Sequence, residues 1–88
     1  MSKRSKLRQR LQRNPKNVSF RDLRTLLEGY GFELKRTKGS HHSFVGKVSG
    51  QSVLIVVPYN QPLQPIYVKQ GLALIEQIEA ESEKDDDE

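Results

Sequence analysis

The chain has 88 residues, enough for one small domain, and 34% of them are hydrophobic while 30% are charged. It has no cysteine, which excludes a disulfide framework, a thiolate metal site and a cysteine nucleophile. Its longest apolar run, residues 53–57, is far shorter than the roughly 20 residues that cross a membrane. The basic N-terminus is followed by no apolar segment, so we expect no secretory signal, no membrane contact and a cytoplasmic protein.

Charge is distributed unevenly along the chain. Residues 76–88 hold eight acids and one base, whereas residues 1–75 hold fourteen bases against three acids, a net charge of +11. A body this basic favours a polyanionic partner, most often nucleic acid. The acidic end is more commonly a solvated, solubilising segment than an internal shield for a basic surface. Residues 81–88 contain no apolar side chain, so we expect a disordered tail.

The first 15 residues form a basic lead. Leu7 and Leu11 lie four positions apart and give a short helix a narrow apolar stripe among six bases. Asn14-Pro15 interrupts this pattern, because proline cannot continue a helix. The lead is therefore either a short helix docked on the domain or a disordered basic segment.

A helix is predicted from about Ser19 to Tyr30. Ser19 suits the N-cap, and Asp22 follows three residues later like the acid of a capping box. Apolar residues recur at helical spacing and form a stripe, which Leu26 widens; they are Phe20, Leu23, Leu27 and Tyr30. Gly31 is expected to end the helix, because glycine tolerates the left-handed conformation of a C-terminal cap.

Three strands are predicted next, at residues 32–37, 41–48 and 51–58, joined by the turns Lys38-Gly39-Ser40 and Ser49-Gly50. Residues 53–57 are apolar and mostly β-branched, as expected of a buried central strand. After a proline-marked loop, a second helix is predicted from about Pro65 to Ala80.

The order α-β-β-β-α predicts an α+β fold. Three antiparallel strands carry two helices on one face, and the other face of the sheet stays open. This is also the order of double-stranded-RNA-binding domains. We divide the chain into a basic lead (residues 1–15), one domain (16–80) and an acidic tail (81–88).

Two adjacent histidines are the main candidates for chemistry. Because side chains alternate along a strand, His42 is predicted to point toward the helices and His41 to lie on the open face. Lys38 and Lys47 lie near His41 in the sequence. A histidine among cations suits proton transfer on a phosphodiester, with the cations stabilising the charge that develops.

Simpler interpretations exist for the same residues. A surface histidine, taken alone, more often has no function than a catalytic one. His42 is expected to be hydrogen-bonded and half-buried, Ser40 to cap the turn with its hydroxyl, and Ser43 to be an ordinary strand residue. Adjacent strand histidines point apart and the sequence shows no third ligand cluster, so no metal site is expected.

Four segments, in this order, resemble the HicA family of toxin-type ribonucleases: residues 14–23 (NPKNVSFRDL), 31–34 (GFEL), 39–44 (GSHHSF) and 56–58 (VVP). With the closing helix, the resemblance covers about residues 14–79. It implies a fold similar to a double-stranded-RNA-binding domain, cleavage of messenger RNA without a metal, and a HicB-type antitoxin as partner. The implied functional histidine follows the Gly-Ser turn, which is His41. After Pro58, where members often have a histidine, this chain has Tyr59-Asn60.

The sequence thus predicts a toxin of a type II toxin-antitoxin system that acts in stress response as an mRNA interferase, with His41 as general base or acid. The residues expected to hold RNA are Lys35, Arg36, Lys38, Gly39, Ser40 and Lys47. We expect no cofactor and a monomer when the antitoxin is absent. One alternative is a non-catalytic RNA-binding module, which the scarcity of bases in the second helix disfavours. Another is a structural protein that serves mainly as a partner's ligand.

Overall fold

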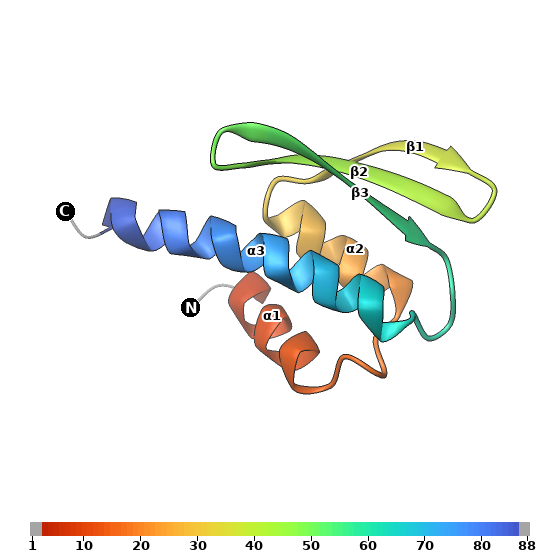
Figure 1. Ribbon diagram of the computed structural model, residues 1–88. Coiled ribbons are helices and arrows are strands. Elements are labelled where there is room, and N and C mark those ends of the chain that lie inside the picture. Colours follow the sequence, from red (N-terminus) through yellow and green to blue (C-terminus); the bar gives the residue numbers. More distant parts are fainter. Residues whose placement is uncertain (1–2, 87–88) are drawn as a thin grey trace.

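The computed structural model describes residues 3–86, which form three helices and three strands (Figure 1). In chain order these are α1 (Lys3–Arg13), α2 (Phe20–Gly29), β1 (Glu33–Lys38), β2 (His41–Val48), β3 (Gln51–Pro58) and α3 (Pro65–Asp86). The strands form one antiparallel sheet in the order β1-β2-β3. From α2 onward the order is α-β-β-β-α, so the predicted α+β fold, similar to a double-stranded-RNA-binding domain, is confirmed.

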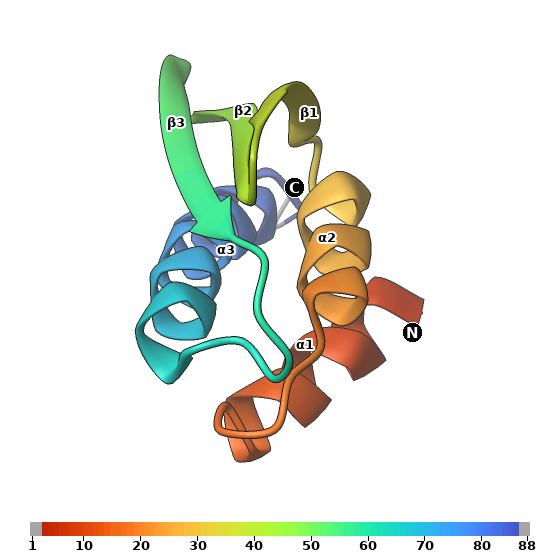
Figure 2. The same cartoon turned by 90° about the vertical axis from the view of Figure 1, so that its right-hand side faces the viewer.

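The molecule is layered. Figures 1 and 2 show α2 and α3 on one side of the sheet, with α1 on the far side of these two helices. The core lies between the sheet and the helices, and its largest fully buried side chains are Phe32, Phe44, Leu23, Leu26, Leu27, Leu63 and Ile75. None of the helices within residues 3–86 covers the other face of the sheet, which we call the open face.

The end of α2 is fixed by a pair of backbone hydrogen bonds. The Gly31 N–H donates to the Glu28 carbonyl at 3.2 Å, and the Phe32 N–H donates to the Leu27 carbonyl at 3.0 Å. Gly31 has φ +95°, so these bonds form the Schellman motif that glycine favours at a helix end. The predicted helix end is confirmed, and the motif directs the buried Phe32 into the core just before β1.

The sequence pattern was misleading for β3. A continuous apolar run predicted a buried central strand, but β3 lies at the edge of the sheet. Leu54 and Val56 are 62% and 37% exposed, whereas Ile55 and Val57 face the helices and are at most 5% exposed. The prediction is wrong because an apolar run does not reveal whether one face or both faces of a strand are covered.

The basic lead is a docked helix. Leu11 of α1 is 2% exposed and belongs to the core, and Leu7 packs against that core. The structure therefore favours the first of the two alternatives for this segment.

The third helix is longer than predicted. α3 continues to Asp86, so the expected end near Ala80 and the expected disorder are wrong for residues 81–86; residues 87 and 88 lie outside the described residues. Glutamate and lysine are good helix formers, and extending an existing helix costs little. The Ser49 hydroxyl also donates to the Glu81 carboxylate, which ties α3 to the β2–β3 turn. None of the helices within residues 3–86 is long and apolar enough to cross a membrane.

Candidate functional site

The strand β2 presents different side chains to the two faces of the sheet. Phe44 and Val48 are buried against the helices, and His42 lies half-buried on the same side. His41 and Lys47 are exposed on the open face. Between β1 and β2, Gly39 has φ +59°, as the first residue of a two-residue hairpin turn often does. His41 is therefore the first residue after a tight turn, at the end of the open face.

Two cations of β1 share this face with His41. Lys38 pairs with His41, and Arg36 pairs with Ser43. Residues directly opposite each other in an antiparallel ladder place their side chains on the same face. The open face therefore carries an imidazole, an ammonium and a guanidinium within two pairs of the ladder, which are separated by the Thr37–His42 pair that faces the helices.

A bulge at Lys35 makes this arrangement compatible with the core. The register shifts between Leu34 and Arg36, so Lys35 is the additional residue. In a regular strand, the alternation that points Leu34 toward the helices would point Lys38 there as well, because the two lie four positions apart. The bulge lets one strand pack the partly buried Leu34 against the core and still present its cations on the open face.

Lys35 itself is paired with an acid. Its ammonium lies 2.8 Å from the Glu33 carboxylate. The hydrogen bond from Lys35 and its positive charge hold the pKa of the Glu33 carboxyl below its usual range. Among the β1 cations predicted to bind RNA, Lys35 is therefore the one whose charge is partly neutralised by a neighbouring acid.

Lys47 is distant from the histidine. It pairs with Ser52 near the β2–β3 turn, whereas His41 pairs with Pro58 at the other end of the ladder. Lys47 lies six positions along β2 from His41, about 20 Å at the usual rise per residue. The structure brings Lys38 and Arg36 to His41 but not Lys47.

The carbonyl oxygen of Ser40 ties the histidine turn to its surroundings. It accepts a hydrogen bond from the Tyr59 N–H at 2.7 Å, and Nδ1 of His42 lies 2.9 Å from it. Since a carbonyl oxygen only accepts, this contact requires the hydrogen of the His42 imidazole to be on Nδ1. The turn is therefore joined both to the end of β3 and to the ring of His42.

Three rings pack where this turn meets the start of α2. The ring of Phe20 lies 4.4 Å from that of His42 and 5.3 Å from that of Tyr59, between centroids. Tyr59 is 50% exposed. The sequence indicated Phe20 as a core residue but gave no signal that Tyr59, in an irregular loop, would join it.

The middle of the open face is apolar. Val45 pairs with Leu54, and Ser43 pairs with Val56. Two of these side chains, Leu54 and Val56, are among the exposed large hydrophobic residues. The prediction of a buried central strand concealed this patch, which lies across β2 from the cations of β1.

The open face thus offers an exposed imidazole flanked by cations, the groups needed to move a proton beside a phosphate. Within residues 3–86 there is no cluster of three histidine, aspartate or glutamate side chains suited to a metal ion.

Comparison with known proteins agrees with this fold. A family model described as the HicA toxin of bacterial toxin-antitoxin systems matches residues 20–78, which is more than half of the chain and runs from the start of α2 into α3. A search of curated proteins and a search of solved structures found no match. The chain belongs to the HicA toxin family of bacterial toxin-antitoxin systems.

Proposed function

We propose that this toxin is a metal-independent endoribonuclease that cleaves messenger RNA, with His41 as general base or acid. The observation that carries the proposal is the exposed His41 directly opposite Lys38, with Arg36 two positions before Lys38 on the same face. The family resemblance of the Gly39-Ser40-His41 segment supports the same residue.

The chemistry needs one group that moves a proton and others that bind phosphate. The imidazole of His41 accepts the proton of a ribose 2′-hydroxyl, whose oxygen then attacks the adjacent phosphorus. The bond from phosphorus to the 5′-oxygen breaks, and that oxygen takes up a proton from solvent water, which leaves a 2′,3′-cyclic phosphate and a 5′-hydroxyl. A single acid–base group of this kind typically gives 10²–10⁴-fold, roughly 3–5 kcal/mol of barrier.

The remaining candidate residues hold the RNA in this proposal. Arg36 and Lys38 bind the phosphates at the reacting centre, where their charge stabilises the transition state. The backbone of Gly39-Ser40 lines the approach to His41, while Lys35 and Lys47 contact the RNA chain farther away.

Cleavage by purified variants tests the proposal. Wild type, His41→Ala and His42→Ala are compared on single-stranded RNA with a chelator present. We expect wild type to cleave and His41→Ala to lose at least a hundredfold in rate. If His41→Ala cleaves like wild type, the proposal fails. If wild type binds RNA but cleaves none, the chain is a non-catalytic RNA-binding module instead.

We further propose that a HicB-type antitoxin silences this toxin in a type II system by covering the open face. The exposed Leu54 and Val56 of β3 share the open face with the cations of β1 on the other side of β2, and together they suit a partner that presents apolar and acidic groups. In cells, expression of the chain alone should arrest growth, and co-expression of the adjacent antitoxin gene should restore it. Arrest that persists in His41→Ala would contradict the proposed mechanism.

A further inference from the structure

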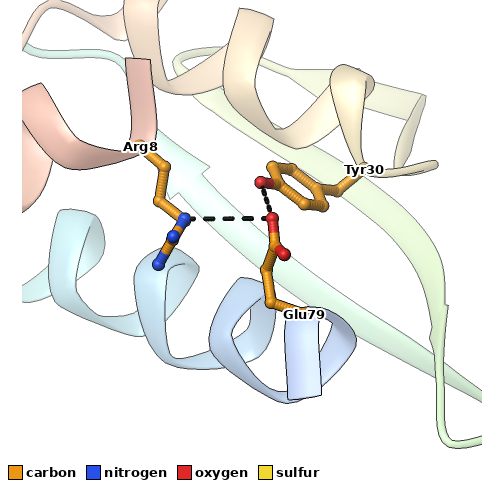
Figure 3. Close-up of polar contacts among 3 residues, drawn as sticks. All are labelled: Arg8, Tyr30 and Glu79. Carbon is orange, nitrogen blue, oxygen red and sulfur yellow. Dashed lines mark hydrogen bonds and ion pairs between the residues drawn. The ribbon is translucent and has the colours of Figure 1, made fainter. Parts of the chain in front are cut away.

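The helix α1 lies outside the region that matches the family, yet it is built into the fold. The Glu79 carboxylate of α3 accepts a hydrogen bond from the Tyr30 hydroxyl and lies 3.9 Å from Nε of Arg8 (Figure 3). Leu11 is buried in the same core. Residues of α1 and α3 therefore meet the residue that caps the end of α2, and α1 is held in a defined place.

The exposed side of α1 carries a row of cations. Lys6, Arg10 and Arg13 are spaced at i, i+4 and i+7, which places them on one stripe of the helix, and all three are exposed. The first 21 residues of the chain contain eight bases and no acid. This charge is not needed for packing, since the core contacts of α1 are made by Leu7 and Leu11.

The row continues to the start of α2. The Arg10 guanidinium lies 3.1 Å from the Asp22 carboxylate in the first turn of α2. Lys16, in the connecting loop, and Arg21, beside Asp22, are both exposed. The loop itself is fixed, because the Leu63 N–H donates to the Val18 carbonyl at 2.9 Å. We call Lys6, Arg10, Arg13, Lys16 and Arg21 the α1 track.

The α1 track leads to the histidine turn. Phe20, the first residue of α2, contacts the ring of His42, whose Nδ1 contacts Ser40 in the turn before His41. Figure 1 shows the start of α2 and the β1–β2 turn at the same end of the molecule. The N-terminus of α2 adds its own partial positive charge at this junction.

We propose that the α1 track binds the backbone of the RNA substrate and guides it past the start of α2 to His41. This inference rests on the proposed endoribonuclease function and extends its substrate site to a surface outside the family region. At the junction, the half-exposed Tyr59 ring, supported from one side by Phe20, offers a stacking surface for an unpaired base. The substrate is therefore RNA with an unpaired segment long enough to reach from His41 to α1.

RNA is the occupant that the charges favour. The track is a line of cations on a rigid support, which matches a polymer with a charge on every repeat. It also ends at the start of α2, where Phe20 contacts the ring of His42 beside the turn that carries His41, the residue that acts on RNA in the proposed mechanism. An acidic protein surface is the alternative occupant, and the binding measurements distinguish it from RNA.

Binding is measured first, in the His41→Ala background, so that no cleavage interferes. The track variant combines Lys6→Gln, Arg13→Gln, Lys16→Gln and Arg21→Gln, and retains Arg10 because it pairs with Asp22. We expect weaker binding of a long labelled single-stranded RNA and a salt slope smaller by about 0.7 for each phosphate that the variant no longer neutralises. Lys69→Gln, an exposed cation on α3, is the control and should change neither quantity.

Cleavage is measured next, in the chain with His41. For long RNA the track variant should raise KM on the order of tenfold, as several exposed charge contacts together would, and leave kcat unchanged. For RNA trimmed to a few nucleotides around the cut, wild type and variant should have the same KM. If the quadruple variant fails to fold, the Lys6→Gln, Arg13→Gln pair gives the same comparison.

Unchanged binding of long RNA by the track variant in the His41→Ala background would overturn the inference. If the same variant also weakens the complex with the antitoxin, the track is a protein-docking surface instead. This result does not depend on cleavage, so failure of this inference is distinct from failure of the proposed function, which would appear as intact RNA without cleavage by wild type.

Discussion

At the scale of single residues, the Ser40 carbonyl oxygen joins the structural elements around His41. It accepts hydrogen bonds from the Tyr59 N–H and from Nδ1 of His42. The turn that carries His41 is therefore held by contacts to the residue that follows β3 and to a ring packed on Phe20 of α2. A catalytic group must be held within a fraction of an ångström of its productive position. The structure therefore assigns His42 the task of holding the turn, beside the proposed task of His41 in catalysis.

Two substitutions at His42 separate the roles of its nitrogens. Asparagine places a donor near the position of Nδ1, whereas glutamine places its amide near that of Nε2. If His42 acts by holding Ser40, His42→Asn should retain the cleavage rate, while His42→Gln should lose part of it and about 1 kcal/mol of unfolding free energy. The measurements are kcat on single-stranded RNA and urea unfolding. A rate preserved by glutamine and lost with asparagine would place the function at Nε2 instead.

The pair formed by Glu33 and Lys35 leads to a second prediction. Glu33 is an acid on the face proposed to bind RNA, and the pKa of its carboxyl is held down by Lys35, so it stays ionised and opposes that charge. Glu33→Gln should release Lys35 and tighten RNA binding a few-fold at low salt, the size expected of one exposed ion pair. Glu76→Gln, an exposed acid on α3, is the matched control in the same titration. Equal effects of the two variants would show that only net charge matters.

At the scale of elements, the parts that the sequence predicted well are those set by local chemistry. The Ser19 hydroxyl accepts the Asp22 N–H at 3.1 Å as an N-cap, and Gly31 closes α2. Ser49 and Gly50 both have positive φ, as the predicted two-residue hairpin turn requires. In each case one or two residue types are needed by one local backbone geometry.

The features that the sequence did not predict depend on which face of the sheet each side chain occupies and on which distant elements of the chain cover that face. The segment from Lys35 to Lys38 is polar throughout, so nothing in it shows that Lys35 is an additional residue or which cations share a face with His41. Leu54 is exposed because none of the described helices covers the face of β3 on which it lies, which an apolar run in the sequence does not reveal. The alternation of side chains along a strand was therefore enough to predict that His41 is exposed, but it did not predict which residues surround it.

The docking of α1 predicts an effect on stability. Leu11 is 2% exposed, so Leu11→Ala should lower the free energy of unfolding by about 2–4 kcal/mol through reduced burial and a residual cavity. Gln12→Ala, at the next and exposed position of the same helix, should stay within about 0.5 kcal/mol. Chemical denaturation of both variants is the measurement. Equal stability of the two variants would mean that α1 does not pack in solution as it does here.

At the scale of the whole molecule, two basic regions serve different contacts in our proposals. The open face carries His41 with the β1 cations and an apolar middle, and the α1 track carries cations on the far side of the helix layer. Acids are concentrated toward the end of α3. From Pro65 to Glu81 its first charged residue is the base Lys69, and the charged residues that follow are all glutamates. A partner can therefore silence the active end without covering every basic residue.

This arrangement predicts which variants weaken the complex with the antitoxin. Lys38→Glu with Lys47→Glu places acids on the open face on either side of the apolar residues, so it should weaken the complex markedly. Lys16→Glu with Arg21→Glu changes the net charge equally but lies on the α1 track, so it should weaken binding of long RNA and leave the complex nearly unchanged. His41→Ala removes one contributor among many and should abolish toxicity while the complex persists.

The kinetics of the same complex provide a separate check on the docking mode. Complementary charge speeds encounter, whereas buried contacts such as those of Leu54 set the lifetime of a complex. Raising the salt concentration should therefore slow association more than it speeds dissociation, and Leu54→Ser should speed dissociation with little effect on association. Surface-immobilised binding of the antitoxin measures both rates. Unchanged affinity in the Lys38→Glu, Lys47→Glu variant together with an unchanged dissociation rate in Leu54→Ser would place the antitoxin on the helices, and occlusion of the open face would be wrong.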